Sequence, residues 1–196
     1  MVDVNKIIEL SEVHPLKVRN IYIYGSQVYG YSRKVSDYDV VLVAPGTSPR
    51  EIKNETYNIH HVMHDRFADD VKNYNIRAME CVFAPEWARP LEKQKFEVEI
   101  IPGKLIGSIL SQSHDMWNQS KRKMYEGDVM RGNKGGFHSL KCLIFGLDIL
   151  NNGRITDFGA IKKLHEEFYS MNFYRWNDLK ETYLPLKREL EERLKS

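Results

Sequence analysis

The chain has few cysteines and almost no excess of charge. Its two cysteines, Cys81 and Cys142, are too few for the disulfide framework of a small secreted domain. No apolar segment at the amino terminus resembles a secretion signal, so we expect a cytoplasmic protein with two free thiols and no membrane partner. A formal net charge of +2 lacks the basic excess of a dedicated nucleic-acid binder. Internal repeats and low-complexity tracts are also missing, which leaves a globular chain of one domain or a domain with a helical extension.

The stretch from Arg19 to Val43 organises the rest of the chain. It begins with a β-branched and aromatic run, Ile21 to Tyr24, which is typical of a buried strand and ends at Gly25-Ser26. After a tight connection, Val40 to Val43 predicts a second buried strand. Two aspartates therefore stand at the entrance of a core strand.

These two residues, Asp37 and Asp39, predict a divalent metal site. Side chains alternate along a strand, so the two carboxylates share a face, with Cα atoms ~7 Å apart. Like charges this close repel each other unless a cation lies between them, and oxygen ligands favour hard ions, so we expect Mg²⁺ or Mn²⁺. Upstream, Gly25 allows a ligand to approach the backbone, and a helix opening at Ser26 would direct its N–H groups at phosphate oxygens. Phosphate beside a metal indicates a nucleotide.

The pair Gly25-Ser26, followed eleven positions after the serine by Asp37-x-Asp39, resembles the nucleotidyltransferase motif of the DNA polymerase beta superfamily. The resemblance extends from Ile21 to Gly153. It implies an α/β (α+β) fold in which a mixed sheet with flanking helices precedes a helical carboxy-terminal part. It assigns Asp37 and Asp39 to catalysis and metal binding, and Gly25, Ser26 and Ser36 to nucleotide binding.

Members of this superfamily take a third acid from the next strand, and the residue at that position here is Asn58. Thr56 to Met63 alternates as a third strand, with Asn58 and His60 on one face. An amide oxygen can ligate a metal but cannot take a proton. Either the general base is missing, or His60 supplies it, or Glu55 or Asp65 serves in another register.

The residues after this strand resemble one branch of the superfamily. Phe67, Asn75 and Glu80 stand where that branch has a helix, an Asn-containing turn and a Glu-bearing helix. The neighbouring histidines do not predict zinc, because zinc needs three or four well-spaced nitrogen or sulfur ligands and no cysteine lies close in sequence.

Apolar periodicity predicts the remaining elements. We interpret Pro102-Gly103 as a break and Gly132 to Gly136 as a joint, and expect a catalytic core at residues 1–102 and a helical part at 103–196. The expected segments are a helix at Asp3 to Glu12, a helix, turn and helix between Asp65 and Cys81, a strand at Phe96 to Ile101, and helices at Leu105 to Tyr125, from the joint to Leu150, at Asp157 to Met171 and at Asn177 to Leu194.

Three residues of the helical part, Lys134, His138 and Lys141, form a candidate phosphate site. His138 and Lys141 are three positions apart, hence on one helical face, where two cations can hold a triphosphate or its pyrophosphate product. The superfamily branch has a similar arrangement, usually with Arg in place of Lys141, and Lys lacks the planar fork for bidentate contact. The alternative is a solvated helical face.

Pattern and resemblance together imply a nucleotidyltransferase that moves an NMP from an NTP to an acceptor hydroxyl with divalent-metal assistance. RNA ends, proteins and small molecules are all acceptors of such enzymes. The competing interpretation is a nucleotide-binding pseudoenzyme or regulatory subunit, because Asn58 replaces an acid. A third, an RNA-end-binding helical module, would depend on the basic run Lys121-Arg122-Lys123 alone.

Overall fold

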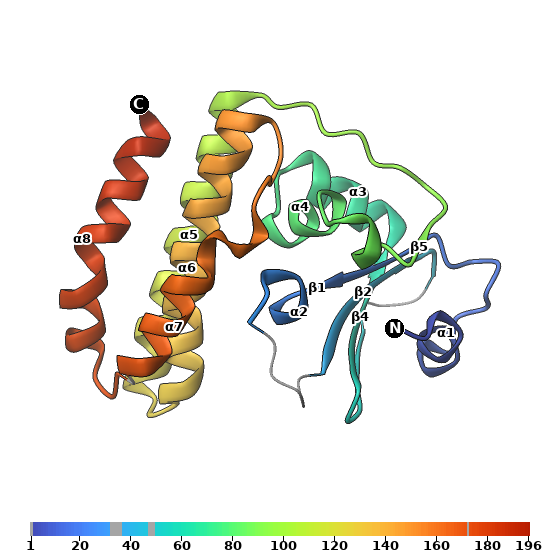
Figure 1. Cartoon of the computed structure of the whole chain (residues 1–196), viewed down its shortest axis with the longest axis horizontal. Helices are drawn as coiled ribbons and strands as arrows, with labels where there is room; N and C mark the ends of the chain where they lie inside the picture. The colour runs from blue at the N-terminus through green and yellow to red at the C-terminus, as the bar shows by residue number, and fades with distance from the viewer. Residues whose placement is uncertain (1, 32–36, 47–49, 172) are drawn as a thin grey trace. The chain divides into compact units, whose positions relative to one another are not determined.

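The structure is a computed structural model that describes residues 2–31, 37–46, 50–171 and 173–196. The chain divides into two compact units, Met1–Glu99 and Ile100–Ser196 (Figure 1). The first unit holds the sheet, and the second is built of helices, so the predicted fold class of a mixed sheet with flanking helices and a helical carboxy-terminal part is confirmed. Among the described residues, no helix combines the length and the apolarity needed to cross a lipid bilayer.

The amino-terminal unit is organised around a five-stranded sheet with the order β3-β4-β2-β1-β5. β1 pairs antiparallel with β2 and β5, and β4 pairs parallel with β2 and antiparallel with β3. Because β2 and β4 are parallel, the polar residues that open these two strands lie at the same end of the sheet. The strands are β1 (Asn20–Tyr24), β2 (Tyr38–Ala44), β3 (Arg50–Lys53), β4 (Tyr57–Met63) and β5 (Leu91–Glu92).

One face of the sheet packs against α1 (Val4–Ser11), the helix predicted at the amino terminus. Ile7 of α1 belongs to one buried cluster with alternate strand residues such as Ile23, Leu42 and Ile59. Since neighbours along a strand point to opposite sides, the residues between these apolar positions point away from α1. That second face carries the polar residues considered below.

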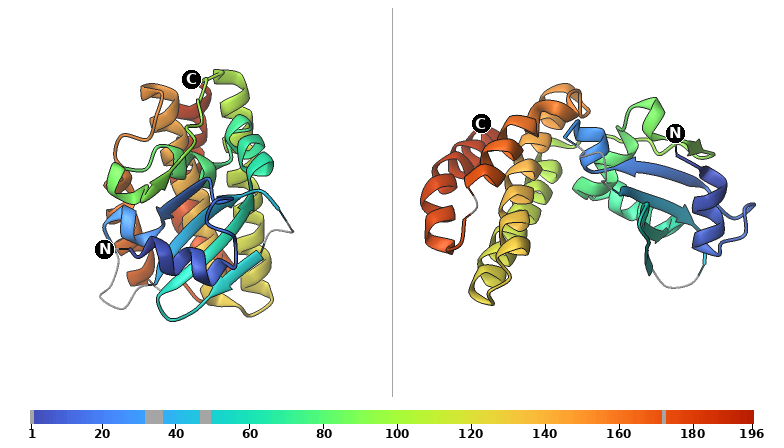
Figure 2. Two further views of the ribbon diagram at one scale, coloured as in Figure 1. Left: turned by 90° about the vertical axis from the view of Figure 1, so that its right-hand side faces the viewer. Right: turned by 60° about the horizontal axis from the view of Figure 1, so that its bottom comes forward.

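The second face is covered by α3 (His64–Lys72) and α4 (Ile76–Val82) (Figures 1 and 2). Phe67 of α3 stacks on Tyr22 of the sheet, with ring centroids 5.5 Å apart. Asn75 caps α4 by accepting two N–H groups of its first turn, at 3.1 and 3.3 Å. The predicted helix, Asn-containing turn and second helix are therefore confirmed.

Two segments of this unit differ from the sequence-based prediction. β3 was not predicted from the sequence, because a short edge strand of mostly exposed residues carries no apolar alternation. Phe96 to Ile101, predicted as a strand, is extended and alternates in burial, yet it joins no strand. Its Phe96 ring packs on Phe67 at 5.0 Å, and Tyr74 donates to the carbonyl of Glu99 at 2.6 Å. The alternation thus comes from packing on α3 and the following turn, while the edge of β1 is taken by β5.

The carboxy-terminal unit is helical, as predicted, and α6 is its central element, in contact with α5, α7 and α8. Pro102 begins α5 instead of breaking the chain, because the first turn of a helix needs no N–H donor there and the fixed φ of proline suits that position. The helices are α5 (Pro102–Tyr125), α6 (Val129–Asn152), the 3₁₀ turn η2 (Phe158–Ile161), α7 (Lys162–Met171) and α8 (Trp176–Lys195).

The glycines from 132 to 136, predicted to form a joint, lie inside α6, so this prediction is wrong. A Cβ on Gly132 would lie 2.6 Å from Cγ of Met124, and one on Gly146, further along α6, would lie 2.5 Å from Cγ2 of Ile109. Both neighbours belong to α5. Close packing between the two helices therefore requires glycine and outweighs its weak helix propensity.

Replacing Gly146 with alanine should lower the free energy of unfolding by about 1–3 kcal/mol, because the new methyl group overpacks against the stiff β-branched side chain of Ile109. The matched control is Gly107→Ala in α5, where no atom lies within 4 Å of the added Cβ. That change should raise the free energy of unfolding by roughly 0.5–1 kcal/mol through helix propensity. Urea unfolding followed by circular dichroism measures both, and shifts of the same sign would contradict the packing role of Gly146.

Candidate functional site

Four polar side chains lie in one row across the second face of the sheet, and we call them the polar row: Tyr24, Asp39, Asn58 and Lys53. The strand register pairs Tyr24 with Asp39, Asp39 with Asn58, and Asn58 with Lys53. Directly paired residues of neighbouring strands project from the same face. A phenol, a carboxylate, an amide and an ammonium group therefore stand side by side, where β2 and β4 begin.

Asn58 is joined to Asp39 within this row. Its Nδ2 donates to Oδ1 of Asp39 at 3.1 Å. Its own Oδ1 is buried and has no hydrogen-bond partner in the described part of the chain. The register places Asn58 beside Asp39, whereas Asp65 lies beyond the opposite end of β4, in α3. The residue next to Asp39 on β4 is thus an amide.

Asp37 directly precedes β2 and forms an ion pair with Lys53. The Oδ2 atom of Asp37 lies 3.8 Å from Nζ of Lys53, and the two side chains are 36% and 67% exposed. A pair this open to solvent contributes at most about 1 kcal/mol. Such a weak ion pair is readily replaced by a more strongly bound cation. The sequence does not predict a role for Lys53, because β3 has no apolar pattern that would reveal a strand.

Gly25 lies directly against the carboxylate of Asp39. Its φ of 78° and ψ of −153° belong to a region that is essentially restricted to glycine. A Cβ at this position would lie 2.6 Å from Oδ2 of Asp39. The two halves of the sequence motif, separated along the chain, therefore adjoin in space, and no larger residue fits between them.

The residues after Gly25 form α2 (Ser26–Tyr29), a single helical turn. The carbonyl of Gly25 accepts the N–H groups of Val28 and Tyr29 at 2.9 and 3.1 Å. A helix thus opens at Ser26, where the sequence predicts one. Ser36, also predicted to bind nucleotide, lies outside the described residues.

His60 lies on the same face as Asn58, two residues further along β4. Its ring meets the ring of Tyr24 edge-on, with centroids 6.1 Å apart. Its Nε2 lies 3.9 Å from Oε1 of Glu51 on the neighbouring strand β3. The adjacent His61 points to the opposite face and is buried. Of these two histidines, only His60 is close to the polar row.

Two residues of α4 that sequence analysis gave no role also reach this site. The guanidinium of Arg77 lies 5.9 Å from the ring centroid of Tyr24, and Glu80 accepts the hydroxyl of Tyr29. Burial raises the pKa of the Tyr24 hydroxyl well above its usual value; the charge of Arg77 lowers this pKa, and the charges of Asp39 and Glu80 raise it. These contacts join segments about 50 residues apart, so no local pattern in the sequence predicts them.

The side-chain oxygens of Asp39 and Asn58 in the polar row, with those of Asp37 just before β2, suit a hard divalent cation. The carboxylates of Asp37 and Asp39 supply anionic oxygens, and the partnerless Oδ1 of Asn58 is a neutral one. No group of three His, Cys, Asp or Glu side chains that could hold a metal occurs within the residues the structure describes. Any metal bound here would therefore depend on the amide, or on substrate oxygens, as its third ligand.

In the carboxy-terminal unit, Lys134, His138 and Lys141 follow one face of α6 at spacings of four and three residues. Lys134 is exposed and His138 is half-buried. Lys141 is buried, and its Nζ lies 5.8 Å from the ring centroid of Phe145. Burial distinguishes Lys141 from a residue on a solvated helical face. Phosphate binding by these three residues stays a prediction.

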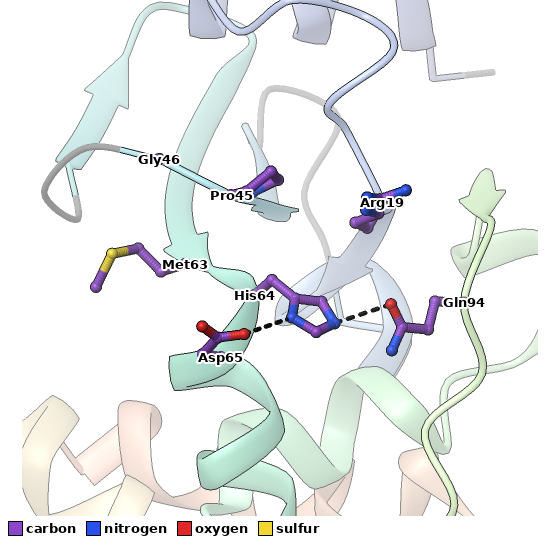
Figure 3. Close-up of a pocket in the computed structure, with 7 residues that line it drawn as sticks. All are labelled: Arg19, Pro45, Gly46, Met63, His64, Asp65 and Gln94. Atoms are coloured by element: carbon purple, nitrogen blue, oxygen red, sulfur yellow. Dashed lines mark hydrogen bonds and ion pairs between the residues drawn. The ribbon is translucent and has the colours of Figure 1, made fainter.

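A cavity of about 360 Å³ lies at the other end of the sheet (Figure 3). It is lined in part by Pro45, which follows β2, and by Met63 and His64, where β4 ends and α3 begins. The His64 ring bridges Asp65 and Gln94 with two hydrogen bonds of 2.8 Å. No member of the polar row lines this cavity, so it is separate from the predicted site.

Comparison with known proteins gives a family and several distant solved structures, two of which are described here. Residues 6–102 match the family model of the nucleotidyltransferase domain. No curated protein matches the chain. A spectinomycin adenyltransferase from Enterococcus faecialis, determined with ATP and spectinomycin, is similar over 99% of this chain and 100% of its own, with 11% identity and a TM-score of 0.49. A nucleotidyltransferase-like protein from Exiguobacterium sibiricum is similar over 97% and 73%, with 10% identity and a TM-score of 0.34.

At these identities and TM-scores the two structures carry no conclusion about the substrate of this chain. The family match does carry a conclusion, because it covers most of α1, the whole sheet with its polar row, and both helices on the second face. Residues 6–102 of this chain therefore form a nucleotidyltransferase domain, which confirms the family that the sequence motif predicted.

Proposed function

We propose that this protein transfers an NMP from an NTP to an acceptor hydroxyl, assisted by Mg²⁺ or Mn²⁺, with residues 1–102 as its catalytic core. One observation carries the proposal: the carboxylate of Asp39 adjoins both the backbone of Gly25 and the amide of Asn58. A phosphate held at the turn formed by Gly25 and Ser26 would therefore lie next to the residues suited to a metal. Nucleotidyl transfer needs these two functions side by side.

Different residues would bind the phosphates and the metal. N–H groups at the start of α2, with the hydroxyl of Ser26, would donate to phosphate oxygens of the NTP. Asp37, Asp39 and Oδ1 of Asn58 would hold the cation, which supplies charge neutralisation for the triphosphate when bound. The acceptor oxygen then forms a bond to the α-phosphorus, the bond from that phosphorus to the bridging oxygen breaks, and pyrophosphate leaves.

The acceptor proton needs a base, and Asn58 cannot take it. His60, two residues further along the same face, can, because a neutral imidazole accepts a proton near neutral pH. The carboxylate of Glu51, 3.9 Å from Nε2, would stabilise the imidazolium that results. We therefore propose His60 as the general base.

A second candidate is a nucleotide-binding pseudoenzyme or regulatory subunit. The observation that favours it is the amide of Asn58 in register with Asp39, where the superfamily pattern has an acid. Such a protein would keep metal-dependent NTP binding and lack transfer.

One experiment separates these functions. The purified chain is incubated with each of the four NTPs labelled at the α-phosphate, with Mg²⁺ or Mn²⁺, and with total RNA or a cell lysate as a source of acceptors. We expect label on an acceptor and release of pyrophosphate, both abolished by EDTA. Metal-dependent binding without either product would support the pseudoenzyme, and absence of metal-dependent NTP binding would contradict both.

A further inference from the structure

Helix α4 contacts the residues that precede and follow the Gly25-Ser26 turn. Tyr24, just before the turn, lies beneath the guanidinium of Arg77 at 5.9 Å. Tyr29, the last residue of α2, donates its hydroxyl to Glu80. Arg77 and Glu80 are three residues apart and therefore share one face of α4. One helical face thus holds the residues at both ends of the turn.

The contact between Tyr29 and Glu80 requires the burial of a carboxylate, which is unfavourable in free energy. Glu80 is 1% exposed and Tyr29 is 2% exposed. Burying a carboxylate costs several kcal/mol before any partner is counted, and apolar residues of similar volume often stabilise a protein as well or better. Burial and the neighbouring Glu80 charge raise the pKa of the Tyr29 hydroxyl well above its usual value, so the donor stays protonated. The hydrogen bond from Tyr29 to Glu80 is therefore better explained by the orientation that it gives Tyr29 than by a gain in stability.

The short length of α2 explains why the orientation of Tyr29 matters. A single helical turn is unstable alone, because nucleation fixes several dihedral angles for one hydrogen bond. Its direction must be set by tertiary contacts at its ends, and α4 is itself fixed by the Asn75 cap. We propose that Arg77 and Glu80 are positioning residues that orient the turn toward the nucleotide phosphates, acting through Tyr24 and Tyr29. This inference rests on the proposed function.

Tyr29→Phe tests the proposal, because it removes the hydroxyl and keeps the ring. The matched control is Tyr74→Phe, which also removes a buried tyrosine hydroxyl, one that donates to the carbonyl of Glu99 at 2.6 Å. Calorimetric titration with Mg²⁺ and the α,β-methylene analogues of ATP, GTP, CTP and UTP gives the Kd of each variant. The titration is carried out well below the melting temperature of that variant. We expect Tyr29→Phe to raise Kd roughly five- to twentyfold, and Tyr74→Phe to change it by less than about twofold. Equal Kd values in the two variants would overturn the positioning role.

Glu80→Gln provides the second measurement, since the amide oxygen still accepts the Tyr29 hydroxyl without the charge. We expect a Kd between those of the wild type and Tyr29→Phe. Loss of transfer with unchanged Kd would instead place Glu80 in the chemistry and overturn the proposal. If the wild type binds none of the four analogues, the proposed function itself fails. If it binds one and both variants bind equally well, only the positioning role fails.

Discussion

Changing Asp39 to asparagine should abolish metal-dependent transfer while leaving the fold intact. Asp39 is the residue at which the turn, the second strand and Asn58 meet, so loss of its charge removes the one carboxylate that touches all of them. An interaction of about 4 kcal/mol with the cation and the transferring phosphate corresponds to a loss of roughly 10³-fold in rate. Initial rates of label transfer from the preferred NTP measure this loss.

Stability should move little in the same variant. Asparagine has nearly the shape of aspartate, and its amide oxygen can still accept from Nδ2 of Asn58. Asp65→Asn is the matched control, because it makes the same chemical change at the far end of β4, on a fully exposed side chain. A normal rate in Asp39→Asn together with a strong loss in Asp65→Asn would move the site to the other end of the sheet.

The polar row shows how far sequence reasoning reaches. Alternation along a strand fixes which face a residue occupies, so the side of β4 that carries Asn58 and His60 follows from the sequence alone. The family resemblance places Asn58 at the third-acid position, and the strand register then sets it beside Asp39. Lys53 could not be found in this way, because β3 is an exposed edge strand without an apolar pattern.

The errors share one physical cause: a local signal was interpreted without knowledge of what packs against it. Glycines in α6 signal a break locally, yet α5 approaches so closely that only glycine fits at Gly132 and Gly146. Alternation in Phe96 to Ile101 signals a strand locally, yet the apolar side packs on a helix. The contacts of Arg77 and Glu80 with the turn have no local signal, since they join segments far apart in sequence.

Asn58→Asp is the change that decides between the enzyme and the pseudoenzyme. The new carboxylate would face Oδ1 of Asp39, where the amide now donates a hydrogen bond at 3.1 Å. Without metal, this repulsion and the lost hydrogen bond should lower the free energy of unfolding by about 1–3 kcal/mol. Mg²⁺ or Mn²⁺ at 100 times its Kd should restore about 2.7 kcal/mol, because the cation binds only the folded chain. Thermal melts with and without metal measure both effects. The control is Asn58→Leu, which also loses the hydrogen bond but gains no charge, and which should gain less stability than Asn58→Asp from the same metal concentration.

The transfer rate then identifies the natural base. If the wild type lacks one, Asn58→Asp should raise the rate roughly 10²-fold, the contribution of a positioned general base. If His60 already serves, the same change should help little, whereas His60→Ala should remove most of the rate. Because His60 and Asn58 are two residues apart on one face of β4, the double variant Asn58→Asp with His60→Ala should recover activity only if a carboxylate at position 58 can take over the proton. No transfer in any of these variants, with metal-dependent NTP binding retained throughout, would leave the pseudoenzyme as the function of this chain.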